Sequence, residues 1–229
     1  MRITLIDAGK RFNRDWIFRH LHYQFHTGKS YAITGPNGSG KSTLLQAIAG
    51  AIDISEGKAS FEMPVTASAG SELSAAGGQP SGSDPGGLQQ TIPPDQVYKY
   101  LAVSAPYLEL IEEMTLTEFL QFHQAFKPFL PGRSIQEIIS SVGLEGSAHK
   151  QIRYYSSGMK QRVKLAQSIF SDTPVVLLDE PCTNLDAQGV DLYRRLIAEH
   201  CAGRLVIVSS NDRQEYDFCG ESINIMDYK

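Results

Sequence analysis

A glycine-rich stretch constrains this chain more than any other part of its sequence: Gly35-Pro-Asn-Gly-Ser-Gly-Lys-Ser-Thr43. The short apolar segment 31–34 before it is expected to form a strand, and residues 42–51 after it have the apolar spacing of a helix. Glycines let the backbone curl, so that successive N–H groups point inward at a helix N-terminus and bind anions. Strand, glycine-rich loop and helix in this order predict a site for the phosphates of a nucleotide.

The chemistry of the loop residues indicates which nucleotide is bound. Lys41 is expected to reach the β- and γ-phosphates, and the Ser42 hydroxyl to ligate Mg²⁺, so ATP with Mg²⁺ is the predicted cofactor. An ordinary glycine-rich turn is the alternative, and the strand before and helix after disfavour it. The loop residues predicted to bind the cofactor are Gly35, Pro36, Asn37, Gly38, Ser39, Gly40, Lys41, Ser42 and Thr43.

A second motif, Val175-Val-Leu-Leu-Asp-Glu180, places two carboxylates at the end of an apolar strand. Asp179 is expected to hold the Mg²⁺ shell, commonly through water. Glu180 is expected to polarise the attacking water, because hydrolysis of a γ-phosphate depends mostly on positioning and charge stabilisation. An apolar strand ending in a solvated acidic turn is common, so this motif indicates a nucleotide site only in combination with the phosphate loop.

Composition narrows the class of protein. The 229 residues are 41% hydrophobic and carry a net charge of −4, so the chain lacks the basic footprint of a nucleic-acid-binding protein. It has no 18-residue apolar run and no apolar signal core, so we expect neither a membrane span nor secretion. The three cysteines are scattered and are expected to be reduced thiols.

Short apolar strands alternate with helical patterns through most of the chain. Strands are expected within 2–26 and at 57–63, 175–178, 205–209 and 223–226, and helices at 157–170 and 186–200. Two capping boxes, beginning at Thr115 and Ser134, predict two further helices. Residues 66 to about 90 consist mainly of Ala, Ser, Gly, Pro and Gln, and we expect a flexible insertion there. The alternation predicts an α/β protein with a parallel sheet.

The segment Tyr155-Ser-Ser-Gly-Met-Lys-Gln-Arg162 opens a helix upstream of the acidic strand. It resembles the LSGGQ signature of ABC-type ATPases, with Ser156 for the Ser, Ser157 for the first Gly and Gly158 for the second. The physical chemistry agrees, since a serine hydroxyl and helix N-terminal amides suit a phosphate supplied across a dimer interface. An ordinary helix N-cap is the alternative for these three residues alone.

The resemblance extends over nearly the whole chain, apart from the insertion. Residues 180–186 look like the stretch that carries the family's D-loop, which places Asp186 at a dimer contact. Phe12, 29 residues before Lys41, stands where the family stacks an aromatic ring on adenine, and Trp16 is a competing candidate. The resemblance implies one domain, 1–229, with a P-loop NTPase fold: a mainly parallel central sheet, an N-terminal antiparallel β subdomain and an inserted helical subdomain at about 106–160.

The chain departs from the family pattern at two places. The family's glutamine at the start of the helical block is missing from 104–113, where Glu109 could substitute as a carboxylate. Asn211 occupies the place of the family's switch histidine; together with Glu180 it completes the predicted catalytic residues. Asparagine can donate a hydrogen bond to a phosphate, but it cannot become a cation or carry a proton. We therefore expect ATP binding to survive and hydrolysis to be slow.

The resemblance implies the ATP-binding and hydrolysing subunit of a multi-subunit ABC transporter. Two copies, or one copy and a related ATPase subunit, would enclose two ATP molecules head to tail, with an integral membrane subunit as partner and the cytoplasmic face of the membrane as location. The alternatives are an ATP-gated binding switch with little hydrolysis and a soluble non-transport ABC ATPase; no nucleic-acid partner is expected. The helical block could offer phenylalanines to the membrane partner, or these could be core residues: Phe119, Phe122, Phe126 and Phe129.

Overall fold

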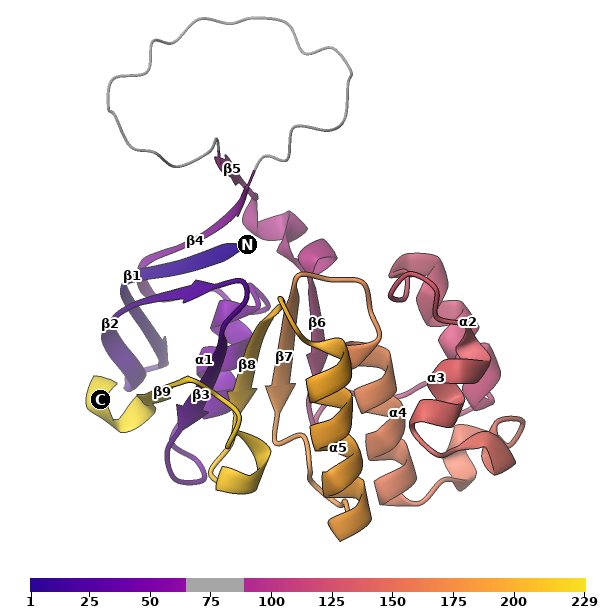
Figure 1. Ribbon diagram of the computed structural model, residues 1–229. Coiled ribbons are helices and arrows are strands. Elements are labelled where there is room, and N and C mark those ends of the chain that lie inside the picture. The colour runs from indigo at the N-terminus through magenta and orange to yellow at the C-terminus, as the bar shows by residue number, and fades with distance from the viewer. Residues whose placement is uncertain (65–88) are drawn as a thin grey trace, which may run out of the picture.

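The computed structural model describes residues 1–64 and 89–229, and the chain folds around two β-sheets (Figure 1). The insertion predicted at 66–90 lies outside the described residues, except for Gln89 and Gln90, which belong to strand β5. Among the described residues, none of the helices combines the length and the apolar character needed to cross a membrane.

The central sheet has five parallel strands in the order β6-β7-β8-β3-β9. Every residue of β7 and β8 is buried, as expected for parallel strands that are covered on both faces. The strands are β3 (Ser30–Thr34), β6 (Leu101–Ser104), β7 (Val175–Asp179), β8 (Leu205–Ser209) and β9 (Glu221–Asn224). Since all five run in one direction, their carboxyl ends meet at one edge of the sheet.

Alternate residues of β7 face two separate cores. Val176 and Leu178 pack into one core with helices α2 to α5, while Val175 and Leu177 pack into the other with α1 and the antiparallel sheet. Figure 1 shows α4 and α5 in front of the parallel sheet and α1 behind it. The helices are α1 (Lys41–Ile48), α2 (Leu116–Phe126), α3 (Ile135–Ser141), α4 (Ser157–Ile169) and α5 (Ala187–His200).

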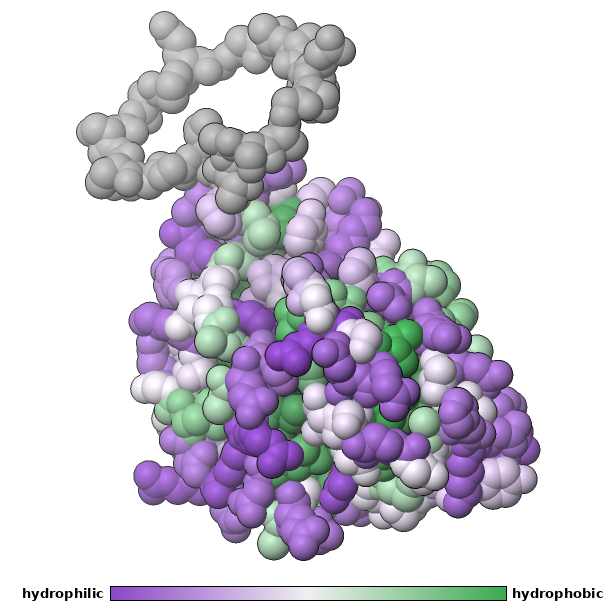
Figure 2. All heavy atoms as spheres, turned by 45° about the vertical axis from the view of Figure 1, so that its right-hand side comes forward, coloured by the Kyte–Doolittle hydropathy of each residue, from purple (hydrophilic) through white to green (hydrophobic). Residues whose placement is uncertain are grey.

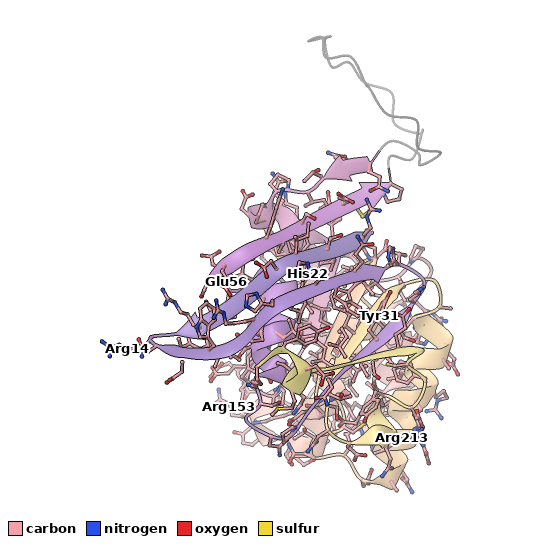
Figure 3. The ribbon with its side chains drawn as sticks, turned by 90° about the vertical axis from the view of Figure 1, so that its left-hand side faces the viewer. Arg14, His22, Tyr31, Glu56, Arg153 and Arg213 are labelled. Atoms are coloured by element: carbon pink, nitrogen blue, oxygen red, sulfur yellow. The ribbon has the colours of Figure 1, made fainter. Side chains whose placement is uncertain are left out.

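The second sheet is antiparallel, with strand order β2-β1-β4-β5. Its inward-facing side chains, among them Ile3, Leu5 and Phe25, are buried in the core shared with α1. Figure 3 faces this sheet and shows Arg14 at the projecting tip of the β1–β2 hairpin. The strands are β1 (Arg2–Phe12), β2 (Asp15–His26), β4 (Glu56–Pro64) and β5 (Gln89–Thr91).

The predicted helices α2 and α3 lie between β6 and β7 in the chain, and both capping boxes form as predicted, at Thr115 and Ser134. The strand predicted at 223–226 is wrong in its second half. β9 ends at Asn224, whose side chain accepts a hydrogen bond from the N–H of Met226 (3.1 Å) and starts a 3-10 helix instead. The 3-10 helices are η1 (Pro94–Tyr100), η2 (Glu145–Ser147), η3 (Ile152–Tyr154), η4 (Arg213–Glu215) and η5 (Ile225–Tyr228).

Candidate functional site

The predicted phosphate loop leads from β3, which lies between β8 and β9 in the parallel sheet, into α1. Gly35, Gly38 and Gly40 all have positive φ angles, of 144°, 76° and 99°. A Cβ atom on Gly40 would lie 2.2 Å from Cγ2 of Ile17, so the loop needs glycine there both for its backbone angle and for the close approach of β2. The sequence therefore folds into a curled loop at a helix N-terminus, the geometry that suits an anion.

Lys41 is buried at the start of α1 and folds back over the loop. Its Nζ donates to the carbonyl oxygens of Gly35 (3.1 Å) and Pro36 (3.2 Å), so the ammonium group lies where a phosphate bound in the loop would meet it. Ser42 follows in the first turn of the same helix.

Asp179 ends β7 and is 2% exposed, and its Oδ1 has no hydrogen-bond partner among the described residues. A buried carboxylate oxygen without a partner indicates an ion or an ordered water. Helix α1, which begins with Lys41 and Ser42, packs against β7 and β8. Carboxylate and hydroxyl oxygens are donors that Mg²⁺ accepts, so Ser42 and Asp179 fit the predicted metal.

Glu180 and Asn211 meet a residue of the phosphate loop in one cavity. Asn37, Glu180 and Asn211 all line a cavity of about 500 Å³. Glu180 has a positive φ of 44°, and its N–H donates to the carbonyl oxygen of Ser209 (2.9 Å), which holds the turn after β7 against β8. Non-glycine residues held at positive φ are concentrated at functional sites. The structure thus brings together three residues that lie far apart in the sequence.

The signature segment opens α4 in a second cavity. Ser156 is the N-cap of α4, and its side chain accepts a hydrogen bond from the N–H of Met159. This second cavity is also lined by Ser157, Gly158 and Asp186; Asp186 lines the first cavity as well. Within one chain the signature residues and the phosphate loop therefore line different cavities.

The two aromatic candidates for adenine stacking differ in what covers them. The Trp16 ring lies under two guanidinium groups, with the Cζ atom of Arg19 4.1 Å from the ring centroid and that of Arg11 5.5 Å away. Phe12, at the end of β1, is 50% exposed, with Nζ of Lys10 5.0 Å from its ring centroid. The more open ring of Phe12 favours it over Trp16.

The loop after β6 contains a residue that the sequence interpretation missed. Burial raises the pKa of Tyr107, a hydrogen bond with Gln46 of α1 lowers it, and the negative charge of Asp179 raises it further. The phenol thus lies near Gln46 and Asp179, whereas Glu109 lines a cavity with Lys160 and Lys164 of α4. The only sequence signal for Tyr107 was its place three residues after β6.

Lys164 and Lys160 fasten this loop to α4. The Nζ of Lys164 donates to the carbonyl oxygens of Ala105 (3.1 Å) and Pro106 (2.9 Å), and Lys160 forms a 2.5 Å ion pair with Glu112. Helix α4, which begins with the signature, is therefore bonded to the loop that carries Tyr107.

Glu215, which no sequence pattern singled out, ties the turn after β7 to the turn after β8. It is 5% exposed, and its Oε1 accepts a hydrogen bond from the N–H of Cys182 (2.7 Å). Burial raises the pKa of Glu215, and the charges of Asp212 and Glu180 raise it further.

Comparison with known proteins agrees with this geometry. The family model described as ABC transporter matches residues 18–183, which is more than half of the chain. The chain belongs to the ABC transporter family. The predicted resemblance is thereby confirmed, as the nucleotide-binding domain of that family.

Curated relatives of this ABC protein align over almost its whole length. The cytochrome c biogenesis ATP-binding export protein CcmA of Rhizobium meliloti is 29% identical over 224 residues, covering 96% of this chain and 95% of the relative. The uncharacterized ABC transporter ATP-binding protein YybJ of Bacillus subtilis is 27% identical over 220 residues, covering 93% and 87%.

Solved structures share the fold of this ABC protein. An ATP-binding subunit of an ABC transporter superposes with a TM-score of 0.76 at 20% identity, covering 98% of this chain and 86% of the other. The dimeric cassette MJ0796 superposes with a TM-score of 0.72 at 19% identity, covering 97% and 94%. The predicted P-loop NTPase fold is confirmed.

Proposed function

We propose that this protein is the ATP-binding and ATP-hydrolysing subunit of a multi-subunit ABC transporter. The observation that carries the proposal is the convergence of Asn37, Glu180 and Asn211 on one cavity beside the loop that Lys41 closes. A solved relative in fold, the cassette MJ0796, has been captured in a post-hydrolysis state with ADP and Pi. Release of phosphate from ATP by the purified protein with Mg²⁺ tests the proposal, and we expect measurable turnover.

Each residue has a distinct role in the proposed reaction. Lys41 would exchange its bonds to the loop carbonyls for the phosphate oxygens, while Ser42 and Asp179 would hold Mg²⁺. When bound, Mg²⁺ supplies positive charge that offsets the charge of the phosphates. Glu180 would polarise the attacking water, and Asn211 would donate a hydrogen bond to the γ-phosphate without moving a proton.

The signature segment would complete the site of a second chain, either another copy or a related ATPase subunit. Its separate cavity supports this, because Ser156, Ser157 and Gly158 line a cavity other than the one at the phosphate loop of the same chain. The N-terminal amides of α4, a helix of 13 residues, would face the phosphate from across the interface. Phe12 would stack on the adenine.

Gly158→Ala is expected to weaken ATP-dependent dimerisation by roughly 10-fold, or about 1.4 kcal/mol. A Cβ atom at Gly158 would lie 2.9 Å from the carbonyl oxygen of Asn184, so the start of α4 and the segment before Asp186 must move apart. ATP binding to the single chain should not change. Sedimentation velocity with and without ATP measures both states.

Gly146→Ala is the matched control, because Gly146 lines the same cavity and a Cβ there meets nothing within 4 Å. Dimerisation of Gly158→Ala as strong as that of the control would contradict the interface assignment.

A membrane subunit is proposed to dock on the exposed side of α2. The four phenylalanines divide: Phe119 and Phe129 are buried, while Phe122 and Phe126 are 44% and 75% exposed and pack ring to ring at 5.0 Å. Figure 2 shows hydrophobic side chains in small groups among hydrophilic ones on the side of the molecule that it presents. Such a partner would hold the protein at the cytoplasmic face of the membrane.

Phe126→Asp is expected to abolish binding to the proposed membrane subunit, because it places a charge in an apolar contact. Folding should be preserved, since the ring is largely in solvent. Pull-down of the detergent-solubilised subunit measures the loss. Met226→Asp, at a 45% exposed position on η5, is the control. Equal binding of the membrane subunit by both variants would show that it docks on another surface.

Asn211 favours one second candidate, an ATP-gated binding switch with little hydrolysis. The side chain lines the cavity with Glu180 but cannot act as a base or an acid. Such a switch would bind ATP and dimerise normally, and would differ only in turnover.

A further inference from the structure

Two register-paired residues at the carboxyl edge of the parallel sheet each carry a buried side-chain oxygen that has no hydrogen-bond partner among the described residues. The first oxygen is Oδ1 of Asp179, the last residue of β7, and the second is Oγ of Ser209, the last residue of β8. The two residues are 2% and 0% exposed. A buried polar atom left without a partner costs about 1–3 kcal/mol. Such an atom in a native protein calls for a specific explanation, and an unseen water or ion is a common one.

The two side chains point to the same face of the sheet. Asp179 and Ser209 are register partners in the parallel pair β7–β8, and paired residues of neighbouring strands project to one side. Two residues earlier on each strand, Leu177 and Ile207 lie in the core shared with α1. The pair therefore faces α1, whose first turn carries Ser42.

Burial alone does not explain the missing partner of Ser209, since other buried serine hydroxyls have one. Ser168 is equally buried, and its hydroxyl donates to the carbonyl oxygen of Lys164 (3.0 Å); Ser171 donates to that of Gln167 (2.6 Å). Within residues 1–64 and 89–229, two other buried side-chain oxygens also lack partners, those of Ser39 and Ser104. Ser104 pairs in register with Leu178 and so projects to the opposite face from Asp179, and Ser39 belongs to the phosphate loop itself.

We propose that Ser209 is a positioning residue of the Mg²⁺ site, where its hydroxyl and the Asp179 carboxylate together hold one water of the ion's coordination shell. The inference rests on the proposed function. Mg²⁺ keeps several of its waters when it binds a protein, and each such water donates two hydrogen bonds. A hydroxyl accepts and donates, while a carboxylate only accepts, so the pair can orient one water more tightly than Asp179 could alone.

Ser209→Ala is expected to change stability and metal dependence in opposite directions. Without nucleotide, the variant should melt at the same or a higher temperature, because it removes a buried hydroxyl that bonds to none of the described residues. The affinity for ATP with Mg²⁺ should fall by about 10-fold, the lower end of what loss of an outer-shell partner costs. The affinity for ATP in EDTA should stay unchanged. Calorimetric titration and thermal melting measure the three quantities.

Two variants control the interpretation. Ser168→Ala removes an equally buried but hydrogen-bonded hydroxyl, so it should lower the melting temperature and leave the Mg²⁺ dependence of ATP binding unchanged. Ser209→Thr keeps a hydroxyl at the same position and should restore most of the affinity for ATP with Mg²⁺.

The inference is wrong if Ser209→Ala leaves the ratio of ATP affinities with and without Mg²⁺ at the wild-type value. It is also wrong if the variant loses stability as Ser168→Ala does. Failure of the wild type itself to bind ATP would contradict the proposed function instead.

Discussion

Lys41→Ala is expected to weaken ATP binding by about 100-fold, the effect of losing two charge-assisted hydrogen bonds worth about 1.5 kcal/mol each. Lys41 is 4% exposed, and its ammonium group already bridges the two carbonyl oxygens at the start of the loop. Phosphate oxygens placed in the loop would meet this charge with little rearrangement. Titration with ATP and Mg²⁺, followed by calorimetry, measures the loss.

The control for this prediction is Lys127→Ala. Lys127 also bridges two backbone carbonyls, those of Tyr98 (3.2 Å) and Leu101 (2.6 Å), but it lies after α2 and far along the chain from the loop. It should lose stability without losing ATP affinity. Unchanged ATP affinity in Lys41→Ala would place the phosphates somewhere other than the glycine-rich loop.

Glu180→Gln is expected to lower ATP turnover by roughly 100- to 1000-fold while ATP still binds, since a positioned general base contributes about that factor. The amide has the shape of the carboxylate, and the N–H of residue 180 still bonds to Ser209, so the turn should keep its form. ATP should then accumulate in a long-lived dimer. Phosphate release and sedimentation velocity give the two readouts.

Glu62→Gln serves as the matched carboxylate control. Glu62 lies on β4 and forms an ion pair with Arg2, away from the predicted reacting groups, so its loss should leave turnover unchanged. Wild-type turnover no faster than that of Glu180→Gln would contradict the ATPase proposal. The binding switch favoured by Asn211 would then be the better account.

Local patterns made the phosphate loop, the strand ending in Asp179 and the N-cap at Ser156 predictable, because each depends on neighbouring residues. The sequence could not predict which phenylalanines of α2 face solvent, because all of them recur at helical spacing, which predicts a single buried face. Predicting Ser209 would have required the register between β7 and β8. Predicting Glu215 would have required its hydrogen bond to the N–H of Cys182, which joins two turns. Such long-range contacts leave no local signal.

The hydrogen bonds and the ion pair that join α4 to the loop after β6 have a mechanical consequence. An α-helix is a stiff rod, and Lys164 lies roughly 12 Å along it from the N-cap Ser156. Because Lys160 and Lys164 are bonded to the segment between Ala105 and Glu112, α4 cannot tilt at its N-terminus without dragging that segment. Force applied where a second chain would touch α4 is therefore expected to reach the segment that carries Tyr107, close to Asp179 of the proposed nucleotide site.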